Sequence, residues 1–114
     1  MSPYQIADEA IDDFFDALDF IASYSPQAAS GWQARMLQAF DVLGEWPQSG
    51  KIRPEFAPPS VRFWIEGDFV VLYDPSSTPL AIIAVLQGAQ DLTTLIAKRV
   101  EDYDYEEETE ETHA

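Results

Sequence analysis

The sequence predicts an α+β domain in which a hairpin of two helices packs on one face of a small antiparallel sheet. Three observations support this class. Apolar residues recur at helical spacing between residues 8 and 43, and three short β-branched and aromatic runs follow between 61 and 87. Turn-forming residues separate these segments. We expect a short N-terminal strand and a three-stranded meander in the sheet, and a short helix at the C-terminal end.

The first helix is predicted over residues 8–22. Its apolar residues repeat at steps of three and four, at Ile11, Phe14, Leu18 and Ile21. Acidic residues occupy the opposite face, and those in the first turn suit the positive end of the helix dipole. The three residues from Tyr4 to Ile6 precede this helix and are expected to form the short strand.

A second helix is predicted to begin after Ser25, whose side chain is a candidate N-cap, with Pro26 at the first helical position. Its apolar stripe consists of Ala29, Trp32, Met36, Phe40 and Leu43. Gly44 and Pro47 mark its end. Because only two or three residues separate the two helices, we expect them to pack as an antiparallel pair.

The strands are predicted after a loop over residues 47–60, which contains four of the eight prolines. The runs 61–65, 69–73 and 80–87 follow, and their short connections favour consecutive hairpins. Asp91 is a candidate cap for the last helix. The inward side of this helix is predicted to contain Leu92, Leu95, Ile96 and Val100.

Length and charge divide the chain into two parts. The 114 residues suffice for one domain, which we place at 1–100. Residues 101–114 contain eight acidic residues and no lysine or arginine, and their lack of periodicity predicts a disordered acidic tail. The whole chain has 21 acidic and six basic residues and a net charge of −15. Because nucleic acids and anionic lipids repel such a charge, we expect no direct nucleic-acid binding and no membrane association.

Several kinds of chemistry are disfavoured by composition. The chain has no cysteine, which excludes disulfides and thiolate catalysis, and its one histidine, His113, lies in the tail. No spacing typical of a metal site occurs, so we expect no metal and no cofactor. The N-terminal residues resemble no secretory signal, and the apolar stretch 79–86 is too short to cross a bilayer. We therefore expect a cytoplasmic protein.

Five short segments follow one another in a characteristic order: DDFFDALDFIA, SPQAA, AFDVLGEWPQSGKIRPE, VRFWIEGDFVVLYDP and IIAVLQGAQDLTTLI. Together they resemble the RelE/ParE superfamily of toxins from bacterial type II toxin–antitoxin modules, and the ParE branch more than the RelE branch. The resemblance covers residues 4–97. It implies this fold, with the first strand at the edge of the sheet, and an antitoxin whose C-terminal segment binds along the toxin as helix and strand. ParE-like members poison DNA gyrase, whereas RelE-like members cut mRNA on the ribosome.

Five residues are candidates for contacts with a partner or target: Arg62, Trp64, Tyr73, Gln87 and Gln90. Arg62 and Tyr73 stand where the family has a strand arginine and a strand tyrosine. The structural alternatives are a surface ion pair for Arg62, and for Tyr73 a packed ring with its hydroxyl in water. Trp64 alternates with Phe63, so one of these two rings must point away from the helical hairpin.

The last strand departs from the family pattern. Ala84, Gln87 and Gln90 stand where family members usually have Arg, His and Arg. RNA cleavage in this superfamily relies on a cluster of basic side chains that bind phosphate and stabilise the transition state. The loss of these three groups therefore disfavours a nuclease, and we expect no catalytic residues and no enzymatic activity.

Three functions remain as hypotheses. The first is the toxin of a type II module, ParE-like, neutralised by a cognate antitoxin and acting on DNA gyrase. The second is a non-toxic relative that retains the antitoxin-binding fold for antitoxin sequestration or a structural role. A ribosome-dependent mRNA endonuclease is the least favoured. Under either of the first two, the antitoxin tail should be rich in Lys and Arg, because it binds an acidic partner.

Overall fold

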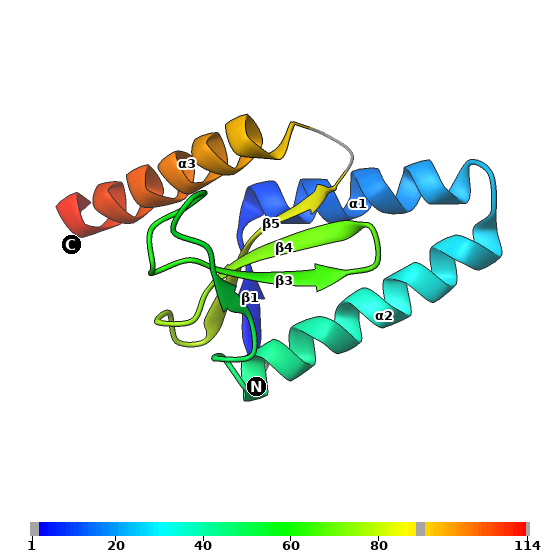
Figure 1. Ribbon diagram of the computed structural model, residues 1–114, viewed down its shortest axis with the longest axis horizontal. Coiled ribbons are helices and arrows are strands. Elements are labelled where there is room, and N and C mark those ends of the chain that lie inside the picture. The colour runs from blue at the N-terminus through cyan, green and yellow to red at the C-terminus, as the bar shows by residue number, and fades with distance from the viewer. Residues whose placement is uncertain (1–2, 89–90, 114) are drawn as a thin grey trace.

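The computed structural model describes the backbone of residues 3–88 and 91–113, and the side chains of these residues as far as 103. It has the predicted α+β architecture (Figure 1). The elements are β1 (Tyr4–Ile6), α1 (Asp8–Ala22), α2 (Pro26–Glu45), β2 (Lys51–Ile52), β3 (Arg62–Glu66), β4 (Phe69–Asp74), β5 (Leu80–Gln87) and α3 (Leu92–His113). No helix in the described part of the chain has an apolar stretch that could cross a membrane.

The helical hairpin forms as its sequence predicts. The Oγ atom of Ser25 accepts a hydrogen bond of 3.1 Å from the backbone N–H of Ala28, which caps α2 at its predicted start. All five residues of the predicted α2 stripe are buried. In α1, Phe14 and Ile21 are buried as expected, but Ile11 is exposed and Ala10 takes its place in the core. The buried face of α1 is therefore rotated slightly from the predicted one.

The sheet has the order β1-β5-β4-β3-β2. The meander β3–β4–β5 is antiparallel, and β1 lies at one edge, as predicted. Two details correct the prediction of an antiparallel, four-stranded sheet. β1 pairs in parallel with β5, which is possible because two helices and three strands provide the long crossover that a parallel pair needs. Lys51–Ile52, predicted as loop, forms β2. The sequence did not indicate this strand, because two residues are too few to show a periodic pattern.

Helices cover both faces of the sheet. In β4, Phe69, Val71 and Tyr73 point into the core shared with α1 and α2, whereas Val70 and Leu72 point into a second core beneath α3. Of the two neighbouring rings on β3, Phe63 is the one that points away from the hairpin. It is nevertheless buried, because α3 packs over that face.

α3 is longer than the short C-terminal helix predicted, since it continues to His113 and includes most of the segment expected to be disordered. Tyr103 explains part of the difference. Its ring packs against the second core, and its hydroxyl donates a hydrogen bond of 2.8 Å to Oδ2 of the buried Asp74. The expected boundary after residue 100 therefore falls within a packed helix, while the division into domain and tail stays a prediction.

One buried arginine joins α3 to α1 and to β5. Arg99 Nε lies 2.9 Å from Glu9 Oε2, and its Nη1 lies 2.8 Å from Asp13 Oδ2. Arg99 Nη2 also donates to the carbonyl oxygen of Ile83 at 3.3 Å, and Asp13 accepts from the N–H of Val85 at 3.0 Å. Side chains thus satisfy backbone groups of β5 beyond the three residues that β1 pairs with.

Candidate functional site

Two of the candidate contact residues meet where β3 begins and β4 ends. Tyr73 is fully buried, and its hydroxyl donates to the carbonyl oxygen of Pro47 at 2.8 Å and accepts from the N–H of Gly50 at 2.7 Å. Arg62 Nη1 donates to the carbonyl oxygen of Gly50 at 2.8 Å. Both side chains therefore hold the segment after α2 against the sheet. The expectation that the Tyr73 hydroxyl stays in water is wrong.

The environment of Tyr73 favours its neutral phenol. Burial raises the pKa of Tyr73 above its ordinary value of 10.0. The hydrogen bond from Gly50 and the nearby charge of Arg62 act in the opposite direction, but more weakly. The neutral hydroxyl can both donate and accept, as the two hydrogen bonds at this position require.

The other two described candidates, Trp64 and Gln87, lie elsewhere. Trp64 is partly buried on the hairpin side of β3, and its Nε1 donates to Glu66 Oε1 at 3.3 Å. Gln87 ends β5 at the opposite end of the sheet from Tyr73 and lines an open cleft. Gln90 lies outside the described residues. Folding therefore distributes the four described candidates over three distinct places.

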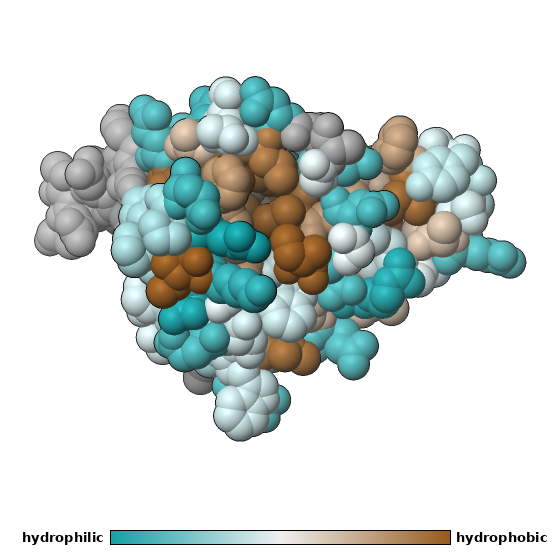
Figure 2. Space-filling model, in the orientation of Figure 1, coloured by the Kyte–Doolittle hydropathy of each residue, from teal (hydrophilic) through white to brown (hydrophobic). Residues whose placement is uncertain are grey.

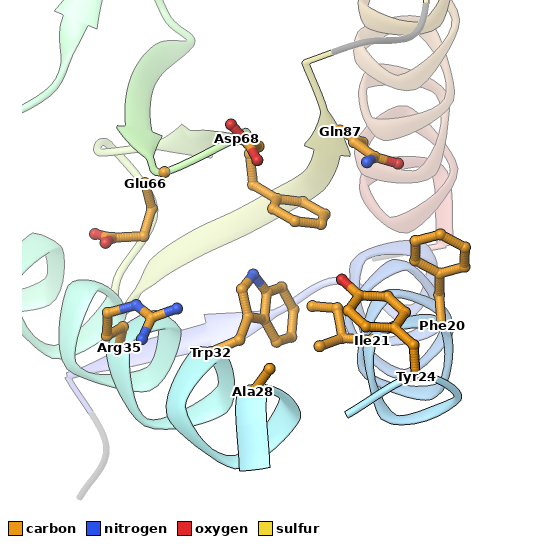
Figure 3. A pocket seen from close by; sticks show the side chains of 11 residues that line it. Phe20, Ile21, Tyr24, Ala28, Trp32, Arg35, Glu66, Asp68 and Gln87 are labelled. Atoms are coloured by element: carbon orange, nitrogen blue, oxygen red, sulfur yellow. The ribbon is translucent and has the colours of Figure 1, made fainter. Parts of the chain in front are cut away.

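The cleft beside Gln87 has a volume of about 270 Å³ and lies between the helical hairpin and the β3–β4 turn (Figure 3). Its lining residues are Phe20, Ile21, Tyr24, Ala28, Trp32, Arg35, Glu66, Gly67, Asp68, Phe69 and Gln87. A second hollow of about 410 Å³ runs along α1 and β5 and shares Phe20, Phe69 and Gln87 with it. The two hollows adjoin at the end of the sheet where β3 ends and β4 begins, which we call the open end. We call their combined surface the Trp32 cleft.

Trp32 forms the floor of this cleft. Its ring lies 5.1 Å, between centroids, from the rings of both Phe14 and Phe69, and the residue is only 6% exposed. Among the described residues, none accepts a hydrogen bond from its Nε1–H. The sequence predicts Trp32 as a core or interface aromatic within the apolar stripe of the second helix. The signal that could have marked it is the residue type, because a buried indole N–H normally has a partner.

Aromatic and acidic side chains surround the floor. Phe20 and Tyr24 project from the end of α1, with exposures of 59% and 67%, and their rings meet edge to face at 5.7 Å. Glu66 and Asp68 flank the β3–β4 turn, in which Gly67 has a φ of +59°. Of the described lining residues of both hollows, Arg35 alone is positively charged. Such a surface combines exposed aromatic rings with carboxylates, which suits an apolar and basic segment.

Other exposed apolar side chains lie outside the Trp32 cleft. Figure 2 shows brown patches separated by hydrophilic residues on the face turned toward the viewer. Exposed apolar side chains outside the cleft are Ile11, Phe15, Val42, Trp46, Ile52, Phe56 and Ile65. None of these lines the Trp32 cleft, so they provide controls for residues that do.

Three of the six basic side chains have partners within the chain. All six lie in the described part of the chain. Arg99 pairs with Glu9 and Asp13, Lys98 pairs with Asp102, and Arg62 binds the Gly50 carbonyl. Among the side chains that the structure describes, acidic and histidine groups form no set of three or more that could hold a metal ion.

Comparison with known families gives a match over most of the chain. The family model described as the ParE toxin of the type II toxin–antitoxin system, parDE, matches residues 4–92. This range begins with β1, ends at the first residue of α3, and contains the helical hairpin, the whole sheet and the Trp32 cleft. No protein with a curated description matches the chain.

Proposed function

The chain belongs to the ParE toxin family of type II toxin–antitoxin systems, and from this premise we propose that a cognate antitoxin neutralises it and that its target is DNA gyrase. The observation that carries the proposal is the family match from β1 to the start of α3. It spans every element of the hairpin and the sheet, so the resemblance extends over a complete fold. The toxin itself would act by binding, without catalysing a reaction.

The distribution of positive charge supports binding over RNA cleavage. A nuclease of the RelE type needs several cations converging on one phosphate. Here Arg99 is buried between two carboxylates and Arg62 is bound to a backbone carbonyl. Inhibition of a protein target requires no such cluster, and an acidic toxin would bind basic surfaces of its target.

Regulated expression of the chain in a bacterial host tests toxicity. We expect growth to slow and DNA-damage signalling to rise, and co-expression of the protein encoded by the adjacent reading frame should restore growth. The purified chain should inhibit supercoiling by purified gyrase. Normal growth with confirmed soluble protein, together with unimpaired supercoiling, would contradict the proposal.

One observation favours the non-toxic alternative. Ala84, which stands where family members usually have arginine, is fully buried beneath α3. A positively charged side chain at this position would be buried in the apolar core beneath α3, which is unfavourable without a partner. The neutral alanine allows α3 to pack there. On this alternative the chain still binds the antitoxin tightly but leaves growth and gyrase unaffected, which the same experiments would show.

A further inference from the structure

We propose that the Trp32 cleft binds a short basic segment of the antitoxin, with one of its backbone carbonyl groups accepting a hydrogen bond from the indole N–H of Trp32. The inference rests on the proposed function, since the antitoxin is the occupant. It assigns the contact to the open end of the sheet, away from Tyr73 and Arg62. Three independent features of the cleft support it.

The first feature is the unpaired donor. A buried polar group without a partner lowers stability, and native proteins contain few of them. Trp32 Nε1–H is such a group among the described residues, and Figure 3 shows the nitrogen directed toward the β3–β4 turn and the open cleft. Indole can donate but not accept, so the missing group is an acceptor. Because Glu66 and Asp68 outnumber Arg35 in the lining, we assign the acceptor to a neutral backbone carbonyl oxygen, which every peptide segment supplies.

The second feature is the aromatic wall. Phe20 and Tyr24 expose most of their surface at the rim. Exposed aromatic side chains beside a concave surface are typical of binding sites, because they contribute large apolar areas at a low cost in side-chain entropy. An apolar side chain of the segment would pack between these rings and Phe69.

The third feature is charge. Asp16, Glu66 and Asp68 line the hollows, and the chain as a whole has a net charge of −15. Asp13 also lines the surface but is occupied by Arg99 and by the N–H of Val85. Glu66 already accepts a hydrogen bond from Trp64, and Arg35 adds one positive charge to the lining. Lysine or arginine in the segment would complement Asp16 and Asp68. A second copy of this chain would be repelled, so the cleft does not favour self-association.

Two α1 variants provide a matched test. Phe20→Ala removes a ring that lines the cleft, and Phe15→Ala removes one of similar exposure, 59% against 54%, that does not. The probe is the purified product of the adjacent reading frame, titrated into the full chain by calorimetry. We expect Phe20→Ala to weaken binding about tenfold or more and Phe15→Ala less than about twofold.

The indole signal of Trp32 reports the hydrogen bond directly. On binding of the antitoxin, we expect the Trp32 Nε1–H resonance to shift and its exchange with solvent to slow. Trp46 is 63% exposed, lies outside the cleft and should change in neither respect. Asp16→Asn with Asp68→Asn should also reduce the salt dependence of association, while Asp12→Asn with Asp41→Asn should leave it unchanged.

The outcomes separate this inference from the proposed function. Tight antitoxin binding that is insensitive to Phe20→Ala, with an unchanged Trp32 signal, would overturn the inference and leave the proposed function standing. If Phe20→Ala reduces gyrase inhibition but not antitoxin binding, the cleft serves the target and the inference is wrong. No binding of the antitoxin and no toxicity would remove both.

Discussion

The two ends of the β3–β4 strand pair differ in how the polar atom of a nearby buried aromatic residue is hydrogen-bonded. At one end, where Arg62 pairs with Tyr73, the phenol both donates and accepts hydrogen bonds within the chain. At the other, where Glu66 pairs with Phe69, the indole N–H of Trp32 faces a cleft without a partner among the described residues. At the first end, which we call the closed end, the hydrogen bonds of the phenol are made within the chain. At the open end we propose that the antitoxin supplies the missing acceptor.

The difference shows that a residue typical of the family can hold the chain's own backbone in place, whatever contacts it makes with a partner. Arg62 and Tyr73 are predicted from the resemblance as sites for a partner, yet their polar atoms fix the segment after α2. Trp32, predicted as a core or interface aromatic, has an indole N–H from which no described residue accepts a hydrogen bond. Because a buried polar atom needs a partner, the location of its partner separates a structural role from a binding role.

Gly50→Ala should have the largest effect on the closed end. A Cβ atom there would lie 2.5 Å from the Tyr73 hydroxyl oxygen and 2.8 Å from the backbone oxygen of Phe63, so packed groups must move. We expect a loss of about 3 kcal/mol in the free energy of unfolding, measured by denaturant titration.

Gly31→Ala is the control at the open end. There a Cβ atom would meet only the flexible end of Arg35, at 3.3 Å, and alanine favours the helix. We expect a gain of about 0.5–1 kcal/mol. Equal effects of the two alanines would contradict the contrast between a closed and an open end.

Tyr73→Phe should have a smaller effect. It leaves the Gly50 N–H and the Pro47 carbonyl without their hydrogen bonds to the phenol while keeping the ring in the core. We expect a loss of about 2 kcal/mol in unfolding free energy. Tyr24→Phe makes the same deletion on an exposed ring beside the cleft and should change stability by less than about 0.5 kcal/mol. A comparable loss in both variants would show that the Tyr73 bonds contribute little.

Alkaline pH should have the smallest effect on the free energy of unfolding. Because burial raises the pKa of Tyr73, the folded protein binds that proton more tightly than the unfolded chain does. This stabilisation is complete below the ordinary value of 10.0 and is lost as pH rises through the raised value. Unfolding free energies on both sides of 10.0 should therefore fall more steeply for the wild type than for Tyr73→Phe. Burial, and then Asp41, also raise the pKa of Tyr4, so Tyr73→Phe should retain part of the slope. Parallel curves would contradict a role for Tyr73.

Local pattern predicted most of the elements because it depends on near neighbours. Helical spacing and the Ser25 cap predicted both helices of the hairpin, and β-branched runs predicted β3, β4 and β5. The two-residue β2 and the parallel direction of β1 were missed, since both depend on pairing with distant strands. The length of α3 was also missed, because the contact between Tyr103 and Asp74 joins residues 29 positions apart.

The sequence by itself determined the fold class, the order of its elements, the strong negative charge and the resemblance to ParE toxins. Tertiary structure alone decided which polar atoms are already paired. The hydroxyl of Tyr73 finds its acceptor 26 residues away at Pro47, whereas Trp32 finds none among the described residues. Periodicity reports which side chains are buried, but hydrogen-bond partners are fixed by segments that only folding brings together.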